Sequence, residues 1–453
     1  MTLGATLVLR RWIPAEDWGL FAWALVVFLV LGAVRDLGLA YHVLRVDPRP
    51  FGNLLALEVG WGGALVVATF ALAPWLAGVN PGHHPDTVGV IRALSVFLFL
   101  EGLSTVPRFY FDGELAVDRV VFAEILRNLC FVGVAVALAI DGRGVWSLVT
   151  AHVAAAALYC VLLWWRAWGE IPLHWARGRT LELVRASLPL ALIWFLLVLT
   201  RHIDPLVLGL LFPYVDIGNY TFAYEWATLA SVQILLPAVG RALYPTLLAL
   251  ADRVEELFRA YSLATILVIS VEVSAALVLF LNAELVLRLV GGEQWTDAPT
   301  YLRILCFAPL VDPFSRLGGE VLKARHLDRE WIASSLLTVL TFGVGGYALS
   351  VRMGPTGMAW INLAPLGGLL MAVALRRVDR AGFDRLCGRL AFIYLSALPL
   401  FTLAGLVPVE RPYLRLSASL VAAAGAAGLV IHRHGGRFRE FFGGLPDAEV
   451  GSA

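Results

Sequence analysis

Long apolar runs separated by short polar connections dominate the pattern of residues along the chain. A helix that crosses a bilayer needs about 20 apolar residues, and runs of roughly that length recur along the whole sequence. They lack the alternating pattern of a membrane-spanning barrel, so they predict an all-α polytopic membrane protein. The thirteen predicted spans are 18–34, 53–79, 88–107, 120–140, 144–165, 187–211, 220–240, 260–281, 299–316, 331–350, 355–375, 389–407 and 413–432.

The composition narrows the class of protein further. Charged residues are 15% of the 453 residues and hydrophobic residues are 59%, whereas about 25% charged residues is usual in soluble domains. These values exclude a soluble enzyme, a disordered protein and a nucleic-acid-binding protein. The net charge of +1 gives no overall field toward a polyanionic partner. All connections between the predicted spans are short, so any chemistry is expected within the bilayer or at its surface.

Basic residues are distributed unevenly between the two sets of alternating connections. One set carries 24 lysine and arginine residues and the other carries 7. Positively charged connections stay on the cytoplasmic side of a membrane. The imbalance therefore predicts that the C-terminus is cytoplasmic.

A short motif occurs twice, with six predicted spans between its two copies. Pro14-x-x-Asp17-x-Gly19-x-Phe21 recurs 199 residues later as Pro213-x-x-Asp216-x-Gly218-x-Tyr220. An even number of spans returns the chain to the same side, so the copies predict two parallel, pseudo-symmetric lobes of six helices. The alternative is that both copies are ordinary turns. The predicted parts are an N-terminal lobe (1–175), a C-terminal lobe (176–378) and two extra C-terminal helices with a cytoplasmic tail (379–453).

Several kinds of catalytic or metal site are not predicted. The only lysine, Lys323, is followed by Ala324, so the chain has no phosphate-binding loop of the ATPase type. No cofactor is predicted. His83 and His84 lie in a polar connection without a third metal ligand nearby, and we expect both to be solvated. The cysteines are far apart and are expected to be free thiols without a metal or disulfide role: Cys130, Cys160, Cys306 and Cys387.

Six segments together resemble one family of membrane transporters. They include IPAEDWGLFAWAL and VRDLGLAYHVLR at the start of the chain and RHIDPLVLGLLFPYVDIGNYTFAYEWATL near its middle. In their order and spacing they resemble the bacterial polysaccharide branch of the multidrug/oligosaccharidyl-lipid/polysaccharide exporter superfamily, over nearly the whole chain. The segments are 13–45, 142–153, 201–229, 244–250, 285–305 and 321–328.

The resemblance implies both a fold and an activity. Members of this family have twelve or fourteen spans in two lobes around a central cavity, and they move polyprenyl-diphosphate-linked oligosaccharides across the bacterial cytoplasmic membrane. The expected function is therefore an O-antigen-type flippase that works by alternating access in polysaccharide biosynthesis. Its expected partners are the lipid-linked oligosaccharide, the bilayer and a polysaccharide polymerase or export machinery. The family pattern includes a full helix before Pro14, so the sequence predicts a truncated or mis-assigned first helix.

Ionisable residues inside predicted spans are the candidates for the site, because they are costly there. Arginine can hold a diphosphate through forked hydrogen bonds, which predicts substrate-binding roles for Arg201, Arg127 and Arg92. The alternative for Arg92 is that its side chain extends to the membrane surface. Glu225 lies between Tyr224 and Trp226, which could stack on sugar rings or belong to an interfacial belt.

Three acidic residues are candidates for gating or ion coupling. Asp204 lies three residues after Arg201, on one helical face, where it could orient the diphosphate, sense a proton or form an internal salt bridge. Glu124 has the same spacing to Arg127. Asp36 lies at a cytoplasmic helix end, where it could be a gating residue or part of a structural pair.

Two other functions are compatible with parts of this pattern. A drug/cation antiporter of the same superfamily would usually have twelve spans and an acidic cavity, whereas this chain has thirteen predicted spans and several arginines within them. A polytopic enzyme acting on lipid-linked sugars, such as a polymerase or acyltransferase, would need a catalytic cluster at one membrane face. The ionisable residues are instead predicted at scattered positions around mid-depth.

Overall fold

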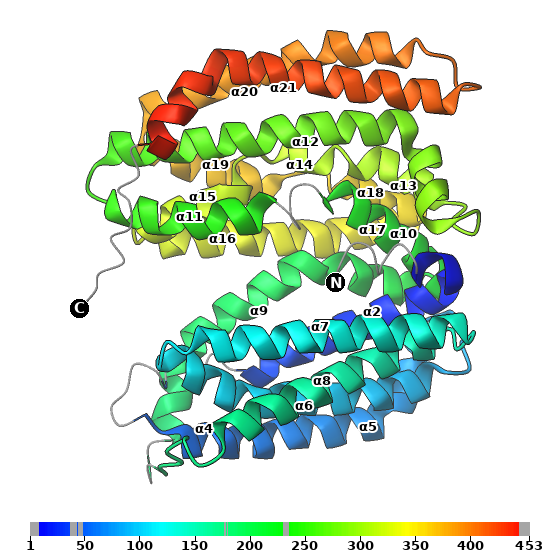
Figure 1. Cartoon of the computed structure of the whole chain (residues 1–453), viewed down its shortest axis with the longest axis vertical. Helices are drawn as coiled ribbons and strands as arrows, with labels where there is room; N and C mark the ends of the chain where they lie inside the picture. Colours follow the sequence, from blue (N-terminus) through cyan, green and yellow to red (C-terminus); the bar gives the residue numbers. More distant parts are fainter. Residues whose placement is uncertain are drawn as a thin grey trace. The chain divides into compact units, whose positions relative to one another are not determined.

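The computed structural model is built from helices and contains no strand in any of the ranges that it describes. Figure 1 shows long helices packed along one another, joined by short turns. The all-α fold predicted from the apolar runs is therefore confirmed. The structure describes residues 9–36, 43, 49–175, 178, 180–229 and 235–443.

The chain forms two compact units. The first contains Met1–Thr221 and Val290–Thr296, and the second contains Phe222–Leu289 and Asp297–Ala453. This grouping places the helix that ends at Leu211 in the first unit, whereas the repeat assigns it to the second lobe. The lobe boundaries at 175 and 378 stay a prediction.

Unit 1 is a bundle in which three consecutive helices run back and forth through tight turns. α6 and α7 are joined by a turn in which Leu115 has a φ of 57°. Between α7 and α8, Gly142 and Gly144 have φ values of 74° and 53°, which glycine adopts without steric cost. The helices are α2 (Ala15–Asp36), α4 (Phe51–Leu57), the π-helical turn η1 (Glu58–Gly62), α5 (Gly63–Ala77), α6 (Thr87–Gly113), α7 (Val117–Ile140), α8 (Val145–Ala167), α9 (Thr180–Leu211) and the first half of α10 (Tyr214–Ala227).

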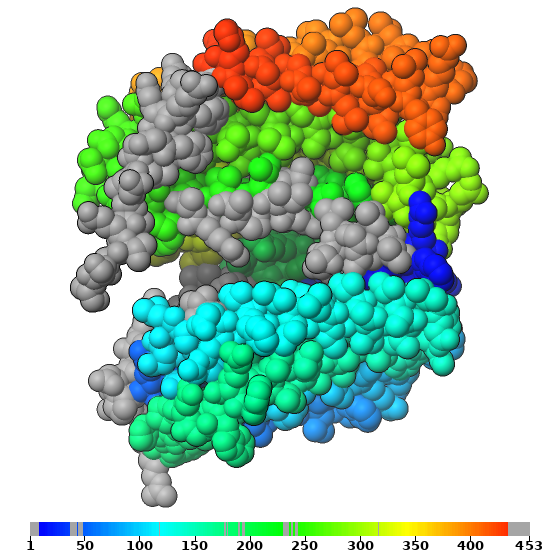
Figure 2. All heavy atoms as spheres, in the orientation of Figure 1, coloured from blue at the N-terminus to red at the C-terminus, as the bar shows by residue number. Residues whose placement is uncertain are grey.

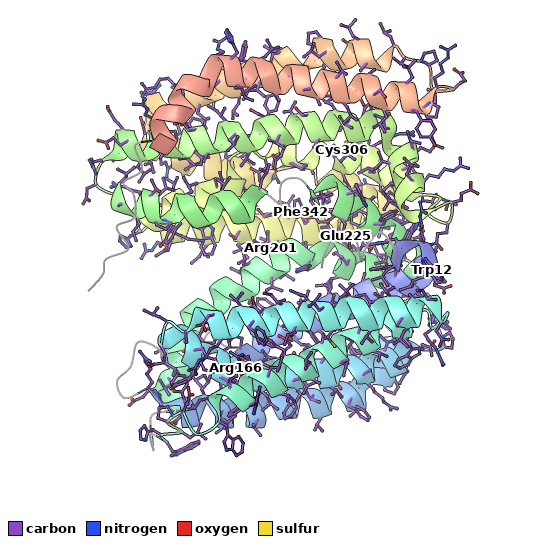
Figure 3. The ribbon with its side chains drawn as sticks, in the orientation of Figure 1. Trp12, Arg166, Arg201, Glu225, Cys306 and Phe342 are labelled. Atoms are coloured by element: carbon purple, nitrogen blue, oxygen red, sulfur yellow. The ribbon has the colours of Figure 1, made fainter. Side chains whose placement is uncertain are left out.

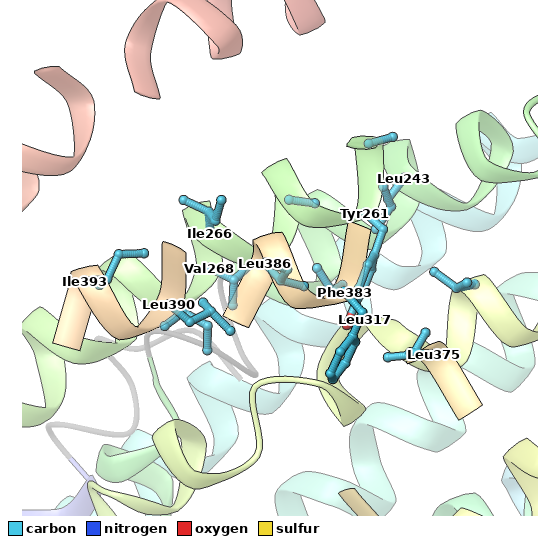
Figure 4. Close-up of a cluster of buried hydrophobic side chains, with 14 of the residues drawn as sticks. Leu243, Tyr261, Ile266, Val268, Leu317, Leu375, Phe383, Leu386, Leu390 and Ile393 are labelled. Carbon is cyan, nitrogen blue, oxygen red and sulfur yellow. The ribbon is translucent and has the colours of Figure 1, made fainter. Parts of the chain in front are cut away.

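Unit 2 packs its helices around a large apolar core. Leu243, Tyr261, Leu317 and Phe383 come from four different helices of this cluster and are all buried (Figure 4). The helices are α11 (Leu236–Ala249), α12 (Val254–Gly291), α13 (Ala298–Leu305), α14 (Ala308–Val311), α15 (Ser315–Ala324), α16 (Asp328–Leu340), the π-helical turn η3 (Thr341–Gly345), α17 (Gly346–Met353), α18 (Pro355–Ile361), α19 (Leu366–Val378), α20 (Arg380–Gly405) and α21 (Pro412–Gly443).

Each predicted span overlaps one or more of these helices. Within the described part of the chain, ten helices are long and apolar enough to cross a membrane, which confirms the polytopic class. The run 299–316 is not one continuous helix: it is divided among α13, α14 and α15. Pro313 lies at the second break, between α14 and α15, where proline removes a backbone donor. The Leu310 carbonyl, in the last turn of α14, accepts a hydrogen bond from Tyr394 Oη at 2.9 Å.

The two copies of the repeated motif lie against each other inside unit 1. α2 begins at Ala15 and α10 begins at Tyr214, at equivalent positions of the motif. A Cβ on Gly19 would overlap the Tyr214 carbonyl, and a Cβ on Gly218 would overlap the Ala15 carbonyl. These contacts exchange places when 199 is added to each residue number, as a two-fold pseudo-symmetry requires. Glycine is needed at both positions because the two backbones touch.

Candidate functional site

A cavity of about 250 Å³ lies between α7 and α8 in unit 1. Figure 2 shows these helices side by side on one face of the unit, α7 in cyan and α8 in green. The α7 residues on its wall have helical spacings of three and four, so they share one face of that helix. The lining residues are Glu124, Arg127, Asn128, Phe131, His152 and Ala155.

Arg127 is the only arginine in this lining, and its guanidinium is held from two sides. Its Nη2 atom is 2.7 Å from Glu101 Oε1 on α6, and its Cζ atom lies 5.1 Å from the centre of the Tyr159 ring on α8. At about 1.5 Å per residue, Arg127 lies about 15 Å along α7 from Val117. That distance is half of a hydrocarbon core of about 30 Å.

A second cavity, of about 260 Å³, is lined by Glu101 of this ion pair and by the part of α6 nearer the turn to α7. Glu101, Thr105 and Arg108 contribute one face of α6 at spacings of four and three. Tyr159 lines this cavity and also lies beneath Arg127. The lining residues are Arg35, Asp36, Glu101, Ser104, Thr105, Arg108, Phe109 and Tyr159.

A deeply buried ion pair, Arg35–Glu58, lies beside the second cavity. Arg35 Nε is 3.2 Å from Glu58 Oε2, and the two side chains are only 9% and 2% exposed. Arg35 Nη1 also donates to the Leu98 carbonyl at 2.6 Å. Gly102 leaves room for the pair, since a Cβ there would lie 2.7 Å from Glu58 Oε2. Glu58 begins the π-helical turn η1, a local distortion that is frequent at functional sites.

Replacing Glu58 with glutamine is expected to destabilise the protein strongly, because it leaves the Arg35 charge without a buried counter-charge. Breaking a buried pair from one side costs about 3–5 kcal/mol. The matched control is Glu114→Gln, which removes an exposed carboxylate 2.7 Å from Arg49 and should cost less than about 1 kcal/mol. Thermal unfolding of both variants in detergent measures the difference. Equal melting temperatures would contradict a structural role for the buried pair.

His152 is packed among aromatic rings at the inner end of the first cavity. Its ring centre lies 4.6 Å from that of Phe131, 4.9 Å from Phe21 and 5.8 Å from Phe97. Its Nδ1 atom is 2.9 Å from the Leu148 carbonyl oxygen. Nε2 is therefore the ring nitrogen that can form a hydrogen bond with a bound molecule.

The prediction that both histidines of the α5–α6 connection are solvated is wrong for His84. His83 is exposed, but the His84 side chain is 12% exposed and its Nε2 atom lies 3.0 Å from Asp17 Oδ1. Asp17 Oδ2 also accepts from the backbone nitrogen of Val145 at 3.1 Å. The Asp17 carboxylate thus joins α2, the α5–α6 connection and the start of α8, contacts that the sequence order of these residues could not reveal.

The predicted site residues fall into separate groups. Arg127 and Glu124 line the first cavity, while Asp36 lines the second. Glu124 and Arg127 do share one face of α7, but Arg127 forms an ion pair with Glu101 on α6. Arg92 is exposed, with its guanidinium 4.8 Å from the centre of the Phe70 ring, away from both cavities.

The remaining predicted residues lie on α9 and α10. Arg201 is exposed on α9 (Figure 3), whereas Asp204 is buried and accepts a hydrogen bond from Tyr220 Oη at 2.5 Å. Tyr220 belongs to the second copy of the repeated motif. Glu225 is half-buried on the part of α10 that belongs to unit 2. The roles of all these residues remain predictions.

Charges of both signs line the two cavities of unit 1. Arg35, Arg108 and Arg127 are matched by Asp36, Glu101 and Glu124. Neither of these two cavities is therefore purely basic. In the described part of the chain, no group of three metal-binding side chains is present.

Sequence reasoning missed the two ion pairs that connect this region. Glu101 and Glu58 were visible as acidic residues in apolar runs, but their partners come from other helices and cannot be found from spacing within one helix. Arg108 lies just beyond the predicted span 88–107 and was therefore assigned to a polar connection. In the structure α6 continues through Pro107 to Gly113.

Three solved structures share this fold at low sequence identity. A lipid II flippase MurJ in an inward closed conformation has a TM-score of 0.75 and 9% identity, over 95% of this chain and 96% of that chain. An inward-facing multidrug resistance MATE family transporter of the MOP superfamily has a TM-score of 0.65 and 17% identity, over 85% and 94%. A MOP superfamily transporter from Pyrococcus furiosus, for which reverse polarity of the binding pocket suggests a different function, has a TM-score of 0.54 and 16% identity, over 85% and 92%.

Comparison at the level of sequence gives the family. No curated protein matches the chain. A family of proteins described as polysaccharide biosynthesis proteins matches residues 8–300, which is more than half of the chain. The chain therefore belongs to this polysaccharide biosynthesis protein family.

Proposed function

We propose that this protein is a flippase that moves a polyprenyl-diphosphate-linked oligosaccharide across the cytoplasmic membrane of a bacterium. The observation that carries the proposal is Arg127, an arginine near the middle of the candidate membrane span Asp118–Ile140 that borders a cavity large enough for a polar group. Membership of the polysaccharide biosynthesis family supports the class of substrate. The fold shared with a lipid II flippase supports the reaction.

The chemistry of the first cavity suits a diphosphate attached to a sugar. The Arg127 guanidinium can donate two parallel hydrogen bonds to phosphate oxygens. The Asn128 amide and the His152 ring can bind further oxygens of the diphosphate or of the first sugar. The polyprenyl tail stays in the lipid, so only the headgroup needs a polar path.

The other candidates would contact the substrate at other stages of transport. Arg201 and Arg92 can bind the diphosphate before or after Arg127, and Glu225 can bind sugar hydroxyls between its aromatic neighbours Tyr224 and Trp226. Asp204 can take part in gating, because its hydrogen bond from Tyr220 links α9 to the repeated motif. Asp36 and Glu124 supply the acidic groups for gating or ion coupling.

Transport proceeds by alternating access of the two lobes, with the C-terminus in the cytoplasm. The excess of basic residues on one set of connections supports this orientation. The driving force comes from the substrate gradient, an ion gradient or the membrane potential, and a unit charge moved through 100 mV is worth about 2.3 kcal/mol. A polysaccharide polymerase or export machinery would then take up the product on the outer side. In this mechanism the protein carries its substrate without chemical change and is not an enzyme.

Deletion of the gene in the native host tests this function. We expect lipid-linked oligosaccharide to accumulate in the inner leaflet, and the wild-type gene to restore its appearance in the outer leaflet. Labelling of intact cells with a membrane-impermeant lectin measures the amount of lipid-linked oligosaccharide in the outer leaflet. Normal labelling in the deletion strain, with only polymer length changed, would favour a polymerase and contradict the proposal.

A drug/cation antiporter is the second candidate, because MATE transporters share the fold and carboxylates line both cavities of unit 1. It predicts a different result in the same strain. Loss of tolerance to cationic drugs, with normal outer-leaflet labelling, would support the antiporter instead of the flippase.

A further inference from the structure

The Arg127–Glu101 ion pair joins a lining residue of one cavity of unit 1 to a lining residue of the other. Arg127 lines the first cavity, Glu101 lines the second, and the bond between them is 2.7 Å long. Both side chains are 28% exposed, whereas those of the buried Arg35–Glu58 pair are 9% and 2% exposed. A bound molecule can therefore reach the Arg127–Glu101 pair and replace one partner, whereas the Arg35–Glu58 pair is enclosed by protein.

A carboxylate and a phosphate compete for the same donors of a guanidinium. Both present two oxygens to the forked N–H groups of arginine. In the structure Glu101 Oε1 lies 2.7 Å from Arg127 Nη2, in the space beside the guanidinium that a phosphate oxygen would use. An anionic headgroup can bind Arg127 fully only when Glu101 gives up this contact.

The second cavity offers Glu101 another set of partners. Thr105 and Arg108 follow Glu101 on the same face of α6, and both line that cavity. The ion pair of Arg108 with Asp112 is long, at 3.9 Å, and its side chains are well exposed. Arg108 can therefore accept a new acidic partner at little cost.

From these contacts we infer that Glu101 is an internal competitor of the substrate for Arg127. It occupies Arg127 when the site is empty, is displaced toward the Arg108 side when an anionic headgroup binds, and returns to help release the headgroup. This inference rests on the proposed function and adds a specificity- and release-determining residue to it. No bond is made or broken in this step, and only the partner of the guanidinium changes.

Competition predicts an unusual response to loss of the carboxylate. Glu101→Gln should bind a prenyl diphosphate about tenfold more tightly than the wild type, because the competing charge is gone, and should release it more slowly. A purely structural role for Glu101 predicts the opposite, since disturbing Arg127 would weaken binding. Arg127→Gln should bind at least tenfold more weakly than the wild type.

Equilibrium binding of farnesyl diphosphate to the full-length protein in lipid nanodiscs tests the inference. The variants are Glu101→Gln, Arg127→Gln and the double variant, with Glu114→Gln as control because it loses a carboxylate from an equally short pair outside both cavities. We expect Glu101→Gln to bind more tightly than the wild type and Arg127→Gln to bind more weakly. The double variant should bind as weakly as Arg127→Gln, and Glu114→Gln should bind like the wild type. If Glu101→Gln does not fold, Glu101→Asp shortens the side chain by one methylene group and should also bind more tightly than the wild type.

Two other results separate the inference from the function on which it rests. If Arg127→Gln weakens binding but Glu101→Gln binds like the wild type or more weakly, Glu101 is no competitor and the inference is overturned, while the diphosphate site remains. If Arg127→Gln binds as well as the wild type, Arg127 is not a diphosphate ligand. That result would overturn both the inference and the proposed site.

Discussion

Replacing Arg127 with alanine is expected to lower the rate of oligosaccharide flipping at least about tenfold. Hydrogen bonds to charged groups are worth about 1.5–3 kcal/mol, and 1.4 kcal/mol corresponds to a factor of about ten. The substitution also leaves Glu101 without its partner on α7, so an unbalanced negative charge remains beside the cavity. The rate at which labelled oligosaccharide appears in the outer leaflet of complemented deletion cells measures the effect.

Arg119→Ala is the matched control for this experiment. Arg119 lies on the same helix and forms an ion pair of the same length, 2.7 Å, with Glu170, but both side chains are more exposed and lie outside the two cavities. Its loss should leave the flipping rate within about twofold of the wild type, since exposed pairs contribute little. Equal effects of the two substitutions, at equal protein levels, would show that the Arg127 cavity has no special role.

Replacing Gly19 or Gly218 with valine should prevent unit 1 from folding correctly. A Cβ at either position would overlap a backbone carbonyl of the other helix, so α2 and α10 would have to move apart. Overpacking usually costs about 1–3 kcal/mol, and a backbone–backbone clash belongs at the upper end of this range or beyond it. We expect a large loss of monodisperse protein and a lower melting temperature for each variant.

Gly133→Val provides the comparison, because nothing lies within 4 Å of a Cβ at Gly133 in the middle of α7. This variant should be recovered in normal amounts. Because the two motif glycines occupy equivalent positions, Gly19→Val and Gly218→Val should have similar effects. Normal yield of either one would mean that the close crossing of α2 and α10 is not needed for folding.

Much of the fold could be predicted because a bilayer imposes simple rules on sequence. Each span must satisfy its backbone within one helix, so the apolar runs matched helices along the described chain. The repeat of Pro14–Phe21 at Pro213–Tyr220 also marks a close contact between two helices. Glycine recurs at an equivalent position in each copy, and the structure shows that these two glycines meet.

The interruptions in the helices were harder to predict. Hydrophobicity is preserved through Pro309 and Pro313, so the run 299–316 resembles one span although its backbone is broken there. The π-helical turn at Glu58 left no signal in the apolar pattern either. Each feature has a contact with another helix that an apolar pattern cannot show, from Tyr394 to Leu310 in the first case and from Arg35 to Glu58 in the second.

The candidate site was predicted only in part, since spacing within one helix identifies residues that share a face but not their partners on other helices. It placed Glu124 and Arg127 on the same side of α7, as the cavity lining shows. It could not identify Glu101 as the ion-pair partner of Arg127, because the two residues belong to different helices. For the same reason it missed the contact between His84 and Asp17.

The most direct measurement is flipping by the purified full-length protein in proteoliposomes. A fluorescent polyprenyl-diphosphate-linked oligosaccharide in both leaflets, bleached from outside by a membrane-impermeant reductant, reports how fast inner-leaflet molecules reach the surface. We expect full bleaching with the wild-type protein, bleaching of about half the signal in protein-free liposomes, and a rate at least about tenfold lower with Arg127→Ala. Half bleaching with the wild-type protein, or equally fast bleaching of a fluorescent phospholipid, would contradict a flippase for lipid-linked oligosaccharides.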